Sequence, residues 1–343
     1  MAVVGRVCFF LLSPCLLAFL AAAGSASASS SLRPPQTRVA APVPQLAELA
    51  EDGVIRVWAL SDIQPRTEWE KAHFLEAVDD VNRNVPGIDL AVVAGDLVKR
   101  PSRARYEWYL AVRDSSYVEH WYEIAGNHDI KSDGGALYRE LVQPRMHFSF
   151  AVEGLLFIMM SDEEPGAPTD ISEETFRWWK RLVEENQDKI IVVVTHAPLE
   201  GSRIPLSHVG RRQIRDSERF RRVLRSKRVD LWLNGHNHVP HWFPYDVSRV
   251  AELGGTVFVN VSAIRKEFMK HSESRILEFR CGSDQVVIRS RDHTKERFND
   301  RLERRFDLSK PLRCDGTAER EGRAAQARPD VSLNNRNGGT PSR

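Results

Sequence analysis

Residues 88–96 read Ile-Asp-Leu-Ala-Val-Val-Ala-Gly-Asp, an apolar run that ends abruptly in Gly95 and Asp96. A short apolar run bounded by a turn residue is typical of a strand buried on both faces. In open α/β sheets, ligands bind where the carboxyl ends of strands meet loops. The stretch therefore predicts a buried strand over 88–94 with a functional aspartate directly behind it.

Four further apolar runs of the chain end in polar residues in the same way. The segments that follow them are Ser61-Asp62-Ile63-Gln64, Gly126-Asn127-His128-Asp129, His196 and Asn234-Gly235-His236-Asn237-His238. Because strand ends gather at one edge of an α/β sheet, five separate segments are expected to deliver side chains to one face.

These strand-end segments supply carboxylates, amides and imidazoles, which form a mixed nitrogen and oxygen set. Such a set suits Mn, Fe, Zn or Mg rather than a metal that prefers soft thiolates. It contains too many ligands for one tetrahedral ion, so we expect two divalent cations that share a bridging carboxylate. Glycines at positions 95, 126 and 235 are expected to let the backbone turn sharply beside them.

The remaining pattern favours an α/β fold of two facing mixed β-sheets flanked by helices. Early strands separated by helices predict crossover connections, whereas later strands without intervening helices are expected to pair as antiparallel neighbours. Asp170 and Glu173 have the spacing of a capping box. The expected strands span 54–60, 88–94, 118–124, 146–152, 155–160, 190–195, 229–234, 257–261, 275–280 and 285–291, and the expected helices span 68–82, 106–112, 170–186 and 213–226.

The N-terminus has the order of an export signal. Arg6 precedes an uncharged apolar run over 7–23 and the cleavage pattern Ala26-Ser27-Ala28. The protein is therefore expected to be secreted or periplasmic, without a stable membrane span; the alternative is an uncleaved anchor, because the run is barely long enough to cross a bilayer. The expected organisation is a signal peptide over 1–28, a linker over 29–45, a folded domain over 46–298 and a polar, disordered tail over 299–343, clearest from 315 onward.

Overall charge and cysteine content narrow the partners and the chemistry. The formal net charge is +2, so no nucleic-acid partner is inferred, and the oligomeric state stays open. Cys8 and Cys15 lie in the signal, which leaves Cys281 and Cys314 either to form a disulfide in an oxidising compartment or to remain unrelated thiols. Neither lies near the strand-end motifs, so a thiol nucleophile is excluded.

Taken in order, the five strand-end blocks resemble the motifs of the calcineurin-like metallophosphoesterases, over residues 54–262. The resemblance implies a facing-sheet fold and hydrolysis of phosphoesters by a hydroxide that bridges two cations. The implied ligands are Asp62, His238 and the bridging Asp96 for the first cation, and Asn127, His196 and His236 with Asp96 for the second. His128 is implied to protonate the leaving oxygen or stabilise charge on the phosphoryl group, with Asp129 orienting its ring.

The chain departs from the family pattern at one position. The family usually carries histidine where this chain has Gln64, whose carbonyl oxygen is a harder and weaker ligand. We expect Gln64 to join the first metal site, weakening it or shifting its preference towards Mn or Mg. The expected substrate is a phosphomonoester or phosphodiester of unknown class. The alternatives are an exported, non-catalytic metal-binding module that retains the fold, and a pyrophosphatase acting on a nucleotide-linked substrate.

Basic and aromatic residues near the motifs are ambiguous. Arg100, Arg103 and Arg105 after the second block either bind a phosphate oxygen or form a solvated surface. The same alternatives hold for arginines 203, 211 and 212. His208, Trp242 and Phe243 lie on loops from which they could reach a substrate.

Overall fold

The computed structural model describes residues 52–164, 169–265 and 272–314. The expected signal peptide and linker lie outside the described residues, as does the stretch from 315 onward. All described residues belong to one compact unit, Val43–Arg343. Among the helices in this described part, none has both the length and the apolar character that a membrane crossing requires.

The first sheet has seven strands. They are β1 (Val54–Leu60), β2 (Leu90–Val93), β3 (Trp121–Glu123), β10 (Glu273–Arg280), β11 (Gln285–Asp292), β12 (Arg297–Phe298) and β13 (Arg304–Asp307). Their order is β12-β11-β10-β1-β2-β3, with β13 also pairing with β11. β1, β2 and β3 are parallel, whereas β10 is antiparallel to both β1 and β11. Helices α1 (Glu68–Asn84) and α2 (Arg103–Arg113) connect the parallel strands.

The second sheet has six strands. They are β4 (His147–Val152), β5 (Leu155–Met160), β6 (Ile190–Thr195), β7 (Leu231–Asn234), β8 (Val247–Val250) and β9 (Thr256–Asn260). Their order is β4-β5-β6-β7-β9-β8, and β5, β6, β7 and β9 run parallel. Helices α4 (Glu173–Glu185) and α5 (Ser217–Leu224) follow β5 and β6.

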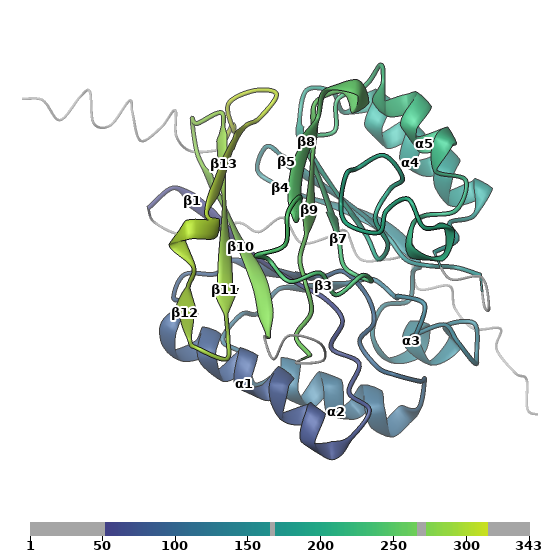
Figure 1. The fold of residues 1–343 in the computed structure, drawn as a ribbon, viewed down its shortest axis with the longest axis vertical. Coiled ribbons are helices and arrows are strands. Elements are labelled where there is room, and N and C mark those ends of the chain that lie inside the picture. The colour runs from purple at the N-terminus through teal and green to yellow at the C-terminus, as the bar shows by residue number, and fades with distance from the viewer. Residues whose placement is uncertain (1–51, 165–168, 266–271, 315–343) are drawn as a thin grey trace, which may run out of the picture. The chain divides into compact units, whose positions relative to one another are not determined.

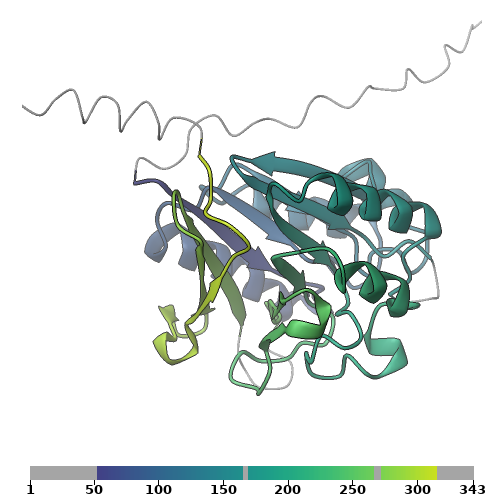
Figure 2. The ribbon, with the colours of Figure 1, turned by 90° about the horizontal axis from the view of Figure 1, so that it is seen from above.

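The two sheets face each other, and their inner faces form one apolar core with side chains such as Val57 of β1 and Val192 of β6. α1, α2 and the short α3 (Ala136–Leu141) cover the outer face of the first sheet. α4 and α5 cover the outer face of the second sheet. Figure 1 shows these helix groups on separate sides of the sheets, and Figure 2 shows α4 and α5 along the outer side of the second sheet. The expected two-sheet α/β architecture is confirmed.

α1 shows why these residues form an element that packs on a sheet. The hydroxyl of Thr67 caps its first turn by accepting from the Glu70 amide. Phe74, Ala77 and Val81 recur at helical spacing and are buried against the first sheet. Most other polar residues of α1 face solvent, whereas His73 and Asp80 are buried with the apolar side chains. The amphipathic pattern therefore sets the orientation of the helix on the sheet.

The structure corrects several expected boundaries. α4 begins at an N-cap on Ser172, which accepts from the Thr175 amide, so the capping box expected at Asp170 is wrong. The helix expected over 213–226 is the shorter α5. β9 pairs with β7 and β8 in the second sheet rather than with β10, because the chain crosses between sheets after β9. α3 and β8 were not foreseen.

The C-terminal boundary expected at 298 is also wrong. β13 pairs with β11, and Leu312 bridges to Cys281, so residues 299–314 belong to the folded domain. Cys281 and Cys314 form a disulfide with their Cα atoms 5.7 Å apart. β13 has only four residues, of which Phe306 alone is apolar, so the sequence gives no strand pattern there.

Candidate metal centre

The loops that follow β1 and β2 continue side by side beyond the sheet. The Asp62 amide donates to the Gly95 carbonyl at 3.1 Å, and the Gln64 amide donates to the Asp96 carbonyl at 3.0 Å. These backbone bonds hold the two loops in one register. As a result, both aspartate side chains emerge at the same edge of the first sheet.

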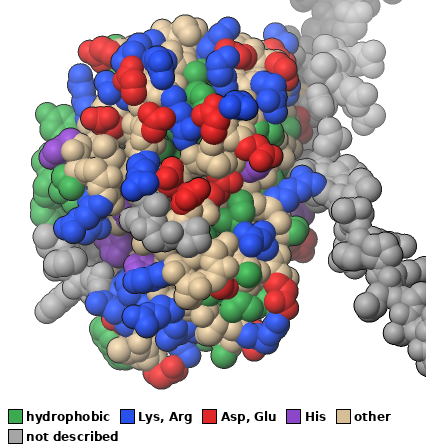
Figure 3. Space-filling model, turned by 90° about the vertical axis from the view of Figure 1, so that its right-hand side faces the viewer, with side chains coloured by type: hydrophobic (Ala, Val, Ile, Leu, Met, Phe, Trp, Pro, Cys, Tyr) green, Lys and Arg blue, Asp and Glu red, His purple; other side chains and the backbone are tan. Residues whose placement is uncertain are grey.

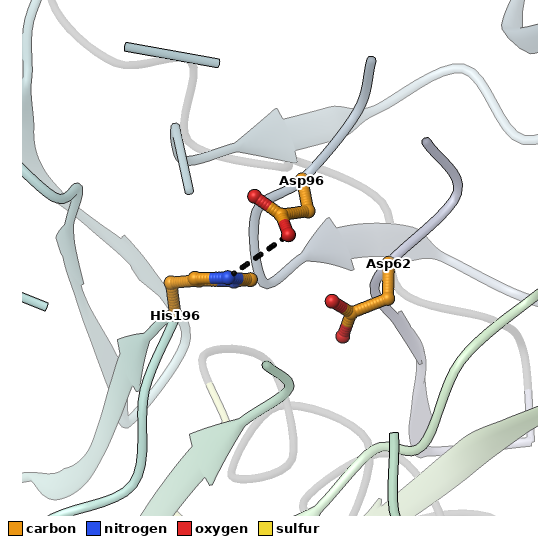
Figure 4. A group of neighbouring side chains, drawn as sticks. All are labelled: Asp62, Asp96 and His196. Atoms are coloured by element: carbon orange, nitrogen blue, oxygen red, sulfur yellow. Dashed lines mark ion pairs between the residues drawn. The ribbon is translucent and has the colours of Figure 1, made fainter. Parts of the chain in front are cut away.

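The second sheet brings His196 to this edge from the end of β6. The His196 Nδ1 bonds to the Ala94 carbonyl at 2.8 Å, so the ring is held across the gap between the sheets. Its Nε2 lies 3.3 Å from the Asp96 carboxylate. One ligand atom each from Asp62, Asp96 and His196 lies within 4.8 Å of the others. Figure 4 shows these three side chains pointing toward one another from three separate segments.

The other predicted ligands surround this group. His236 Nδ1 lies 3.1 Å from His196 Nε2, which also lies 3.1 Å from the Asn127 Oδ1. His238 Nε2 lies 2.9 Å from the Asp62 carboxylate. The structure thus brings the predicted carboxylate, amide and imidazole ligands into one cluster.

Two imidazoles are oriented by hydrogen bonds on the side away from the cluster. His196 gives its Nδ1 to the Ala94 carbonyl, and His236 gives its Nε2 to the Arg211 carbonyl at 3.2 Å. A ring N–H that donates to a carbonyl leaves the other nitrogen free to bind a cation. The remaining nitrogens, Nε2 of His196 and Nδ1 of His236, are those that face the cluster.

Four of the predicted ligand residues have strained backbones. Asp62, Asp96, His236 and His238 have φ values of 55°, 58°, 66° and 48°, in the left-handed region that non-glycine residues rarely adopt. Each such conformation costs on the order of 1–3 kcal/mol and is found mainly at functional sites. The strain therefore points to a site in which side-chain direction matters more than local stability.

The three glycines expected to turn the backbone have two different roles. Gly95 has a φ of +87°, which fits the expected sharp turn. Gly126 and Gly235 lack such a φ and are needed for space: a Cβ at Gly126 would overlap the Asp96 carboxylate, and one at Gly235 would overlap the side chains of Ser61 and Asp62. These positions keep the ligand loops close to each other.

The charges of the buried cluster suit a cation. Burial raises the pKa of Asp62 and Asp96, but His238 and His196 outweigh this effect and hold both pKa values below their ordinary range. Burial likewise lowers the pKa of His196, yet the two carboxylates raise this pKa well above its ordinary value. Two buried carboxylates thus require a compensating positive charge, which a divalent cation supplies when it displaces the proton. The donor set fits such an ion.

His128 contacts a residue that sequence reasoning did not single out. Its Nδ1 bonds to the Lys99 carbonyl at 3.1 Å, and its Nε2 lies 3.0 Å from the Lys99 ammonium. The structure therefore corrects the orienting role expected for Asp129. That carboxylate instead accepts from the amides of Gly126, Leu97 and Val98, and so ties two ligand loops together. Burial and the nearby Asp96 raise the pKa of Asp129 to about 7.

Gln64 lies in the cluster, with its amide nitrogen towards the carboxylates. Its Nε2 donates to Asp96 at 2.8 Å, and its Oε1 accepts from the Lys99 ammonium at 3.2 Å. This orientation follows from the hydrogen-bond partners, since a carbonyl oxygen would be repelled by the carboxylate. In this arrangement the Gln64 oxygen faces Lys99 rather than the Asp96 carboxylate.

Asp162 is a further buried acid near the cluster that was not predicted. It follows β5, and its amide donates to the Ala125 carbonyl at the end of β3 at 3.0 Å. Burial raises its pKa to about 7, although the nearby His196 opposes this shift. The strand-end rule that identified the other segments could have found it, because Ser161 and Asp162 directly follow an apolar strand.

Facing mixed sheets with outer helices, and a buried carboxylate and imidazole cluster at the strand ends, are the features that define metallophosphoesterases. A family model described as calcineurin-like phosphoesterase matches residues 55–240, and the chain belongs to this family. No curated protein sequence matches the chain.

Solved structures share the fold at low sequence identity. A purple acid phosphatase, PPD1, from yellow lupin (Lupinus luteus) seeds is 13% identical with a TM-score of 0.55, over 76% of this chain and 55% of that one. The chain thus spans about half the length of that phosphatase. GAP50, the anchor in the inner membrane complex of Plasmodium, is 14% identical with a TM-score of 0.49, over 79% of this chain and 94% of that one.

Proposed function

We propose that the protein is an exported phosphohydrolase that uses two divalent metal ions to cleave phosphomonoesters or phosphodiesters. The observation that carries the proposal is the convergence of Asp62, Asp96 and His196, whose ligand atoms lie within 4.8 Å of one another in a buried cluster. The strained φ values of the two aspartates support a functional rather than a structural origin of this cluster.

The surrounding residues divide into two ligand groups. Asp62, His238 and Asp96 would hold one cation, and Asn127, His196 and His236, with Asp96 shared, would hold the other. When bound, such a pair of cations polarises the phosphoryl group and lowers the pKa of a coordinated water. The backbone amide of His128 donates to Asp96 Oδ1 at 2.8 Å and so fixes the orientation of the shared carboxylate.

His128 is the residue that handles the proton of the leaving group. As a water oxygen bonds to phosphorus, the ester P–O bond breaks. The departing oxygen takes a proton from His128 Nε2, which carries one when both ring nitrogens are protonated, and the proton that the water loses returns to the ring. The Nδ1 bond to the Lys99 carbonyl fixes the ring, so that Nε2 is the nitrogen available for this transfer. The Lys99 ammonium beside Nε2 is placed to neutralise charge on a phosphoryl oxygen.

Substitution of His128 tests this assignment. His128→Ala should retain bound metal, measured by elemental analysis, and lose about 10²–10⁴-fold in kcat on p-nitrophenyl phosphate. His120→Ala is the matched control, because His120 precedes β3 at the strand end opposite to the metal centre. An unchanged kcat in His128→Ala would show that another group handles the proton.

A panel of divalent metals tests the proposed activity itself. The chain should hydrolyse p-nitrophenyl phosphate or its bis-ester with at least one of Mn, Fe, Zn and Mg. Metal binding without turnover of any ester would instead identify a non-catalytic metal-binding module. Each metal has to be tested separately, because the ligands present do not select one of the four.

Export is supported by the Cys281–Cys314 disulfide, since such bonds persist in oxidising compartments. Mass spectrometry of the protein recovered outside the cytoplasm should give a mature N-terminus after Ala28. Recovery of the uncleaved chain in the membrane fraction would favour an N-terminal anchor.

A further inference from the structure

A cavity of about 430 Å³ lies beside the metal centre, at the N-terminal ends of α1 and α2. It is formed by the loops that continue from two ligand segments, after Gln64 and after Asp96. Its lining includes the cations Arg66, Lys71, Lys99 and Arg105, together with the acid Glu68 and the indole of Trp108. Positive charge therefore predominates in this basic cavity.

Lys99 belongs to both the metal centre and the basic cavity. Its ammonium lies 3.0 Å from His128 Nε2 and 3.2 Å from Gln64 Oε1, and the same side chain lines the cavity wall. An ammonium has three N–H donors, so one remains after these two contacts. The cavity and the reaction centre are thus separated by one side chain.

The charges within the cavity are only partly matched. Glu68 pairs with Lys71 at 2.8 Å, and Arg66 pairs with Glu70 at 3.6 Å, so two of the four lining cations have acidic partners. Arg105 donates to the carbonyl of Arg100 at 3.2 Å, and the described residues offer it no ion-pair partner. Figure 3 shows lysine and arginine side chains over much of one face, mixed with acidic side chains in its upper part and with few acidic neighbours at the lower left, where histidine side chains lie close by.

We propose that the basic cavity binds a second phosphate group of the substrate, so that the preferred substrates carry two phosphates on a short spacer. The inference rests on the proposed phosphohydrolase function and specifies its substrate class. One phosphate occupies the metal centre and is cleaved, while the other is held by Arg105 and by Lys71, which shares its N–H donors between Glu68 and this phosphate. Lys99 lies between the two phosphate positions. Guanidinium and ammonium groups form charge-assisted hydrogen bonds to phosphate that are stronger than neutral ones.

Propane-1,3-diol monophosphate and bisphosphate are a matched pair of probes. Release of inorganic phosphate by the metal-loaded protein should give a kcat/KM at least about tenfold higher for the bisphosphate, through a lower KM, as expected for one added charge-assisted contact. Ethane-1,2-diol and butane-1,4-diol bisphosphates then show which spacer fits.

Arg105→Gln should reduce the ratio of kcat/KM for bisphosphate over monophosphate about tenfold, and Lys71→Gln should reduce it in the same direction. Arg103→Gln is the matched control: it removes the same charge from the same helix, but Arg103 pairs with Glu140 and does not line the cavity. The control should keep the parent ratio.

Three results would overturn the inference or separate it from the function. Equal kcat/KM for the two probes overturns the second phosphate site and leaves the hydrolase function intact. If Arg103→Gln and Arg105→Gln reduce the ratio of kcat/KM for bisphosphate over monophosphate equally, the inference is overturned in favour of general charge attraction. If neither probe is hydrolysed, calorimetry of the bisphosphate decides: weaker binding in Arg105→Gln but not in Arg103→Gln supports the second phosphate site, and unchanged binding in both refutes it. The hydrolase function is decided separately by the p-nitrophenyl esters.

Discussion

Asp80 on α1 is the acid on which a buried polar network depends. Its carboxylate accepts from the Arg291 guanidinium through two nitrogens and from His293 Nδ1 at 2.7 Å. His293 Nε2 bonds to the Ser274 hydroxyl at 2.7 Å, and this hydroxyl also accepts from the Trp58 indole at 2.8 Å. Although serine, histidine and aspartate are aligned as in a hydrolase triad, Ser274 is fully buried and no substrate can reach it. We therefore interpret the network as a tie between α1 and the first sheet.

Asp80→Ala should destabilise the protein severely. The substitution leaves Arg291, which is 3% exposed, as an uncompensated charge inside the protein. Removing one partner of a buried ion pair costs about 3–5 kcal/mol. For a domain of this size, about 2–4 °C per kcal/mol then predicts a fall in Tm of about 6–20 °C. Urea unfolding followed by tryptophan fluorescence measures the free energy, and a differential scan measures Tm.

Asp79→Ala is the control, because Asp79 is the exposed neighbour of Asp80 on the same helix and should change stability by less than about 0.5 kcal/mol.

Burial raises the pKa of Asp80, but His293 and Arg291 outweigh it and hold the pKa below its ordinary value. The unfolded state therefore takes up the proton first, so this stabilisation is present above about pH 4 and is lost as the pH falls further. If Asp80→Ala lowered the free energy of unfolding by less than about 1 kcal/mol at pH 7, as expected for an exposed ion pair, the interpretation of Asp80 as a buried tie would be refuted.

Three further predictions concern the centre and the C-terminus. Asp96→Asn should retain its circular dichroism spectrum but lose bound metal in elemental analysis, because it removes the shared charge. Gly235→Ala should lose about 1–3 kcal/mol in urea unfolding and also bind less metal, because the added methyl overlaps Ser61; an unchanged protein would show that the loop has room. Cys281→Ser opens a disulfide between residues 33 apart and should cost about 2–4 kcal/mol in the same assay, whereas an equal stability would show that Cys314 contributes no covalent restraint.

The two-sheet fold could be predicted because its central strands are apolar runs with sharp ends. β6 and β5 are buried along their full lengths, so composition alone identifies them. β8 and β13 lie at sheet margins and have only four residues each; every second residue of β8 is buried, whereas β13 alternates half-buried with exposed residues. A pattern of four residues cannot be told from that of a loop. Both segments are strands because they pair with β9 and β11, and the sequence pattern does not show this pairing.

The positions of the cluster residues could also be predicted from the sequence, whereas the hydrogen-bond partners of His128 and Asp129 could not. Asp62, Asp96 and His196 each follow a buried strand, so their convergence is a consequence of parallel topology. Lys99 gave no such signal, because its contact with His128 depends on how the loop after Asp96 folds back. Asp129 was given the wrong role for the same reason: adjacency in sequence says little about which way a side chain points within a tight loop.

Lys99 also explains how this chain accommodates glutamine at position 64. The ammonium holds the Gln64 oxygen, and the amide nitrogen donates to the Asp96 carboxylate, so both ends of the amide are engaged. Turning the oxygen towards a cation would place the amide NH₂ against the ammonium and break both bonds. Gln64 is therefore better suited to position the shared carboxylate than to replace an imidazole ligand. In the proposed two-metal site, a first cation held by Asp62, Asp96 and His238 alone would keep more open positions for water and for phosphoryl oxygens of a substrate.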